Sequence, residues 1–201
     1  MRLKMMTMGM VLGACCLVSV GSVTVGAQMM KMDGPMKMGK DSPAKALDDL
    51  LSLYEGEALG VAKAMPANKY NFAPSAAIFA PGQDVKFDTV RTFVEQITHV
   101  AEANYYFYSA VGGMKPDVDM KALGDIKTKD EAVAALAASF KFAHQAIATI
   151  TPENAFLPIK PIDGQGTRAT VAAFGVAHGY DHYGQLVEYL RMNGVVPPGS
   201  K

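Results

Sequence analysis

The chain has 201 residues, and its 19 Lys and Arg residues balance 19 Asp and Glu residues, so its formal net charge at pH 7 is zero. Half of the residues are hydrophobic and 19% are charged, which is too apolar for a disordered chain and, at this length, predicts one globular domain. Because no excess of basic residues exists to neutralise phosphates, the composition does not favour nucleic-acid binding.

Residues 1–27 have the pattern of a secretory signal peptide. Arg2 and Lys4 precede an apolar run of residues 5–20, and small residues then lead to Val25-Gly26-Ala27, which is typical of a cleavage site. The apolar run is short for a membrane span. We therefore predict export to the periplasm or the cell exterior, with cleavage after Ala27.

A lipoprotein is the alternative for this leader. Leu12-Gly13-Ala14-Cys15 resembles a lipobox and would leave Cys15 lipidated, although the following residues stay apolar. Cys15 and Cys16 are the only cysteines of the chain. After cleavage at Ala27, the exported protein would have no disulfide, thiol nucleophile or cysteine ligand.

Residues 28–42 are rich in methionine. Met29, Met30, Met32, Met36 and Met38 alternate with lysine, glycine and proline without a helical or strand period, which predicts a flexible linker. Because thioether sulfur is a soft ligand, Cu(I) binding by this segment is an alternative function for it.

The first amphipathic helix is expected from about Pro43 to Met65. Asp41 or Ser42 can cap it, Pro43 suits its first turn, and Pro66 ends it. Three further helices follow. The second is expected over residues 88–111 and stops at Gly112-Gly113. The third is expected over 129–150, where Thr128 and Glu131 suit a capping box. The fourth is expected over 167–193.

No segment alternates convincingly between polar and apolar residues, so no sheet is expected. Four helices of about 20 residues predict an all-α fold, a four-helix bundle over residues 43–201. The connections 66–87, 112–127 and 151–166 are longer than a minimal bundle needs. We expect them to cross the bundle or to cover a site.

Two of the four histidines lie one helical turn apart on the last helix. His178 and His182 are near the centre of its apolar stripe, and this spacing lets both rings reach one metal ion. The alternative is a pair of core histidines satisfied by hydrogen bonds. His99 lies off the strongest stripe of the second helix, so periodicity permits a role in the site without establishing one. His144 lies at the edge of its stripe and is interpreted as a boundary residue.

Three segments resemble the DinB-like superfamily of metal-binding four-helix bundles in its exported form. They are MPANKYNFAP at 65–74, FVEQITHVAEANYYF at 93–107 and HGYDHYGQLVEYLRMNGVVPPGS at 178–200. In this family, one histidine of the second helix and two of the last bind a divalent metal such as zinc or nickel. The resemblance implies that His99, His178 and His182 are the ligands here. It does not imply DNA binding.

Three imidazoles leave a coordination position open for water or substrate. A hydrolase would also need a proton carrier, and Glu102 and Asp181 are the candidates, although either could instead orient an imidazole or be an exposed helix charge. Gln185, one turn beyond His182, could hydrogen-bond a ligand, and Tyr106 shares a face with His99 and could line a pocket.

Three functions therefore compete. The first is a metal-dependent hydrolase or transferase acting on an unidentified small molecule. Transfer of low-molecular-weight thiols, known among relatives of this fold, fits export poorly because such thiols are kept inside the cell. The second is a metal-binding module without catalysis, and the third is a structural bundle. Related bundles often form homodimers, so a dimer is also open.

Overall fold

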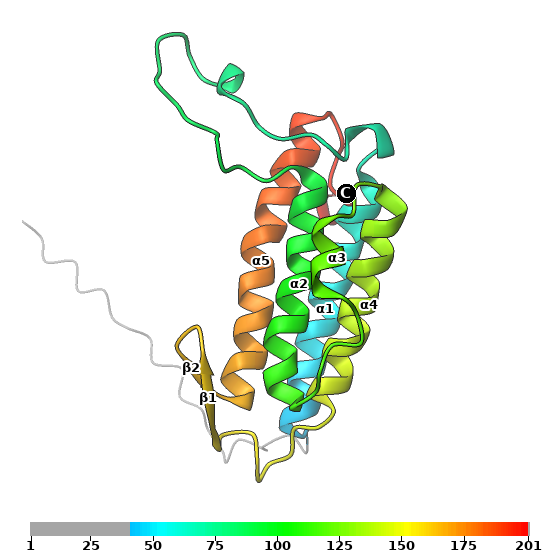
Figure 1. Cartoon of the computed structure of the whole chain (residues 1–201), viewed down its shortest axis with the longest axis vertical. Coiled ribbons are helices and arrows are strands. Elements are labelled where there is room, and N and C mark those ends of the chain that lie inside the picture. Colours follow the sequence, from blue (N-terminus) through cyan, green and yellow to red (C-terminus); the bar gives the residue numbers. More distant parts are fainter. Residues whose placement is uncertain (1–40, 201) are drawn as a thin grey trace, which may run out of the picture. The chain divides into compact units, whose positions relative to one another are not determined.

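The computed structural model describes residues 41–200, in which four long helices pack as the predicted four-helix bundle (Figure 1). None of the described helices is long and apolar enough to cross a membrane. The predicted signal peptide and residues 28–40 of the predicted linker lie outside the described residues. The four helices are α1 (Pro43–Ala64), α2 (Phe93–Gly112), α4 (Lys129–Ile147) and α5 (Arg168–Met192).

Helix α2 packs against α4 and α5, and α1 packs against the same two helices, so α1 and α2 occupy one diagonal of the bundle. Helices α1 and α5 run in one direction, and α2 and α4 run in the other (Figure 1). Because of this order, α2 and α5 are antiparallel neighbours although about 55 residues separate their ends.

Side-chain caps set the helix starts. Ser42 caps α1 with Pro43 in the first turn, as predicted. The start predicted for the second helix, at residue 88, was wrong, because Thr92 and Glu95 form a reciprocal capping box that begins α2 at Phe93. Thr128 caps α4, but the carboxylate of Glu131 accepts a hydrogen bond from the Thr128 hydroxyl at 2.6 Å, and the expected box is incomplete.

The prediction of no strands was wrong for the last connection. β1 (Pro158–Ile162) and β2 (Gln165–Thr167) form an antiparallel hairpin directly before α5. Asp163 and Gly164 form its turn with φ of 45° and 79°, the left-handed region that favours Asp-Gly in tight hairpins. The Asp-Gly pair was the sequence signal for this hairpin.

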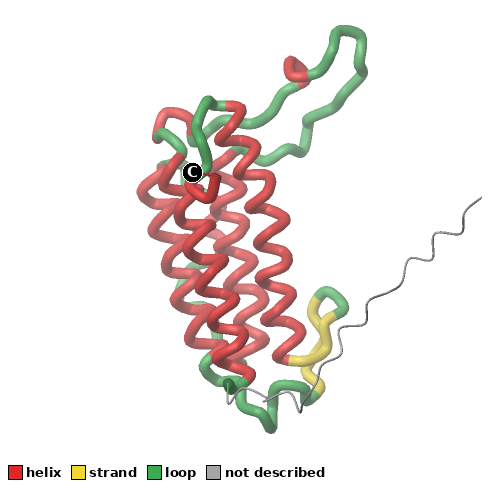
Figure 2. The backbone as a smooth tube through the Cα atoms, turned by 180° about the vertical axis from the view of Figure 1, so that it is seen from behind, coloured by secondary structure: helices red, strands yellow, loops and turns green. Residues whose placement is uncertain are grey.

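The other two connections are also long, and each contains short helical segments (Figure 2). The first includes the short turns η1 (Ala67–Lys69) and η2 (Ala76–Ile78). The second returns along the bundle from the end of α2 to the start of α4, and it contains the short helix α3 (Met120–Gly124), which packs against α2. After α5, the short turn η3 (Pro198–Ser200) lies against α1.

An unusually close contact joins α1 to α5 beside two of the histidines. The ring of Tyr54 is buried, 1% exposed, and occupies the space that a Cβ would need at Gly179. Gly179 lies between His178 and His182 along α5. The glycine therefore lets α1 approach α5 at the level of the histidine pair.

Candidate metal centre

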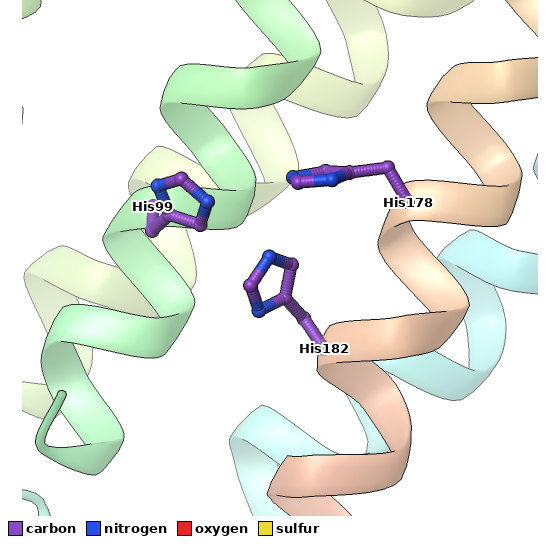
Figure 3. Close-up of side chains that lie close together, drawn as sticks. All are labelled: His99, His178 and His182. Carbon is purple, nitrogen blue, oxygen red and sulfur yellow. The ribbon is translucent and has the colours of Figure 1, made fainter. Parts of the chain in front are cut away.

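His99 of α2 meets His178 and His182 of α5 between the two helices (Figure 3). The ring centroids are 5.5 Å apart for His99 and His178, 4.7 Å for His99 and His182, and 4.6 Å for His178 and His182. One ring nitrogen from each residue lies within 4.8 Å of the others. The structure thus brings together the three histidines that the resemblance implied.

The donor set fits a divalent metal ion. Nε2 of His178 is buried and has no hydrogen-bond partner among residues 41–200. Burying such a nitrogen without a partner costs about 1–3 kcal/mol. An ion between the rings would supply the missing partner.

The electrostatics favour neutral imidazoles, the form that binds metals. Burial lowers the pKa of His99 to about 4, aided by Arg91 and the other two histidines. Burial likewise lowers the pKa of His182 to about 4 and lowers that of His178. Protons therefore compete little with a metal for these nitrogens near pH 7.

A chain of hydrogen bonds leads away from His182. Its Nδ1 lies 2.8 Å from Oε1 of the buried Gln96, whose Nε2 donates to Oε1 of Gln185 at 2.7 Å. Nε2 of Gln185 then donates to Oδ2 of Asp181 at 3.2 Å. Gln96 was not among the residues predicted for the site, although its position one turn before His99 was a signal for it.

A cavity of about 420 Å³ opens beside His99 and His178. Helix α2 supplies Glu102, Ala103, Tyr106 and Phe107 to its wall, α3 supplies Met120 and Lys121, and the hairpin turn supplies Asp163. Tyr106, which was expected to share a face with His99, is among the residues of this wall. Two of the three long connections, 112–127 and 151–166, thus contribute to the wall of this cavity, as expected of a connection that covers a site. The first connection, 66–87, contributes no residue to it.

The structure separates the two candidate proton carriers. Glu102 lines the cavity, with Oε2 4.0 Å from Nδ1 of His99, and its partial burial raises the pKa of its carboxyl although Arg91 opposes this. Asp181 is exposed and does not line the cavity; it receives the hydrogen bond of Gln185. Gln185 is linked to His182 through hydrogen bonds to Gln96.

His144 lies elsewhere, between α1 and α4. Its Nδ1 is 2.6 Å from Oδ1 of Asp48, and its Nε2 is 3.1 Å from Oε2 of Glu55. The two carboxylates face opposite ring nitrogens, so they do not converge on one ion. His144 is therefore a partly buried bridge between two helices and takes no part in the three-histidine group.

The chain matches the model of a known protein family. A family model described as DinB superfamily matches residues 51–186, which include α2, α4 and all three histidines. A search of curated proteins finds no similar sequence.

Proposed function

Because the chain belongs to the DinB superfamily, we propose that His99, His178 and His182 bind one divalent metal ion, zinc or nickel, for hydrolysis or group transfer on a small molecule. The observation that carries this proposal is the group of three histidines, in which Nε2 of His178 is buried and has no hydrogen-bond partner among the described residues. When bound, such an ion supplies Lewis-acid polarisation and makes hydroxide available near neutral pH.

The cavity supports a small-molecule substrate. Its volume of about 420 Å³ lies within the range of small-molecule sites. Phe107, Tyr106 and Met120 would contact an apolar part of the substrate, while Lys121 and Asp163 place opposite charges in the wall.

Glu102 is the proposed proton carrier. Its raised pKa brings the carboxyl closer to neutral pH, which suits a group that both takes and returns a proton. Its place in the wall beside His99 puts it within reach of a molecule in the cavity. If the protein is exported as predicted, hydrolysis fits better than transfer of intracellular thiols.

Elemental analysis of the untagged protein tests the metal centre. We expect about one equivalent of zinc or nickel, and we expect His99→Ala and His182→Ala to lose most of it because two imidazoles bind far more weakly. His144→Gln is the matched control and should retain the metal, since His144 contacts only Asp48 and Glu55. Absence of metal after incubation with zinc and nickel would contradict the proposal.

An activity screen then separates an enzyme from a metal-binding module without catalysis. Esters, amides and thiol–electrophile pairs are assayed with and without a chelator, in the wild type and in Glu102→Gln. A rate that the chelator abolishes and that Glu102→Gln lowers about 10²–10⁴-fold supports the enzyme. A metal-loaded protein without any chelator-sensitive rate would support the non-catalytic module.

A further inference from the structure

The hydrogen-bond chain from His182 to Asp181 has a direction, because its members differ in what they can donate and accept. A carboxylate only accepts, an amide accepts at oxygen and donates at nitrogen, and a neutral imidazole donates at one ring nitrogen only. Asp181 therefore accepts a hydrogen bond from the side-chain nitrogen of Gln185 at 3.2 Å. As a result, the side-chain oxygen of Gln185 points toward Gln96.

The same logic continues inward. Gln96 donates its N–H to Gln185 at 2.7 Å, so its own oxygen points at His182. Because an amide oxygen can only accept, Nδ1 of His182 must carry the proton. Nε2 is then left with its lone pair, which is the form a metal ligand needs.

The opposite direction would disable the ligand. If both amides flipped, the Gln96 nitrogen would donate to Nδ1 and the proton of His182 would move to Nε2. The Gln185 oxygen would then face the Asp181 carboxylate, two acceptors with no proton between them. Asp181 is the member of the chain that makes the two directions unequal.

Burial protects the inner part of this arrangement. Gln96 is 3% exposed and His182 is 5% exposed, so water does not readily replace their mutual hydrogen bond. Asp181 lies at the surface, one turn before Gln185 on α5, where substitution does not disturb the core.

We propose that Asp181, acting through Gln185 and Gln96, is a positioning residue that fixes the His182 tautomer able to bind metal. The proposal rests on the proposed metal centre. It adds that a surface carboxylate outside the cavity controls the protonation site of a buried ligand across two helices.

The direct test is histidine-selective ¹⁵N NMR of the metal-free protein. We expect His182 to be protonated at Nδ1 in the wild type and to gain a clear Nε2-protonated fraction in Asp181→Ala. A wild-type ring protonated at Nε2, or a ring unchanged by Asp181→Ala, would overturn the proposal. Because no metal is present, this result stands apart from success or failure of the metal centre.

Zinc affinity provides the second readout. Loss of partners that orient a ligand typically costs about 10–100-fold in metal affinity, so Gln96→Leu should weaken zinc binding by that amount. Asp181→Ala, which leaves Gln96 in place, should weaken zinc binding measurably but by less than Gln96→Leu does.

A Gln96→Glu background separates positioning from simple charge. That carboxylate accepts from Nδ1 whatever its neighbours do, so it fixes the tautomer without Asp181. In this background Asp181→Ala should no longer change the His182 tautomer or the zinc affinity. An equal loss of affinity in both backgrounds would mean that Asp181 acts only through its charge.

Discussion

At the residue scale, Gly179 lies at a position where the two histidines of α5 and the close packing of α1 on α5 come together. It lies between two histidines of the candidate metal centre, and the ring of Tyr54 fills the space of the side chain it lacks. The helix wheel of α5 placed His178 and His182 correctly on the inward face, because that inference depends only on spacing. The need for glycine at 179 could not be derived in this way, because it comes from a residue 125 positions earlier in the chain.

Gly179→Ala tests this contact. The new methyl group would overlap Tyr54, so we expect a loss of about 1–3 kcal/mol in the free energy of unfolding and weaker zinc binding, measured by urea denaturation and zinc titration. Gly184→Ala on the same helix is the control, since a Cβ there meets open space. It should stabilise the protein by about 0.5–1 kcal/mol, and equal effects of the two variants would contradict the assignment.

At the element scale, α2 shows why His99 was ambiguous in the sequence. Its strongest apolar stripe contains Val94, Ile97 and Tyr108, which are all buried. The helix packs against both α4 and α5, so a second buried face carries Gln96 and His99. A helix wheel finds one dominant face, and it cannot assign a neighbour to the second face.

The bridge of His144 to Asp48 and Glu55 links α1 to α4 and predicts a pH dependence. Burial opposes the charged ring, but hydrogen bonds to both carboxylates outweigh it and raise the pKa of His144 above 6.5. A pKa raised on folding stabilises the protein fully below the unfolded value, and this contribution is lost as the pH rises through the folded pKa. Lys45 of α1, paired with Asp49, and Gln145 of α4 lie nearby.

His144→Gln should therefore cost about 1 kcal/mol at pH 5.5, a small value because the bridge is partly exposed to water. At pH 8.5 the cost should be clearly smaller. Urea denaturation of wild type and variant at both pH values measures the difference. A cost that is the same at the two values would show that the ring contributes by packing alone.

At the scale of the whole molecule, the site depends on chain order. Amphipathic spacing and capping residues were sufficient to predict the four helices and most of their ends, because both signals are local in the sequence. The pairing of α2 with α5 is not local, since Gln96 and His182 are 86 residues apart. The resemblance of three sequence segments, rather than periodicity, predicted the meeting of the three histidines.

Metal binding by two helices should stabilise the whole bundle. At free zinc of about 100 times the dissociation constant, mass action adds about 2.7 kcal/mol, which raises Tm by about 5–11 °C for a domain of this size. Calorimetry of the metal-free protein with and without zinc measures this shift. His182→Ala should lose the response and His144→Gln should keep it; a response that persists in His182→Ala would point to zinc bound elsewhere.

The make-up of the cavity wall has a consequence for how such a protein can diversify. Helix α3 and the hairpin turn contribute Met120, Lys121 and Asp163 to the cavity wall, but they supply none of the three imidazoles. Exchanging these two segments would therefore change which molecules fit the cavity. The three histidines would stay in place. Part of the cavity wall is thus encoded in two connections that contain none of the three histidines, whereas α2 supplies both His99 and four further residues of the wall.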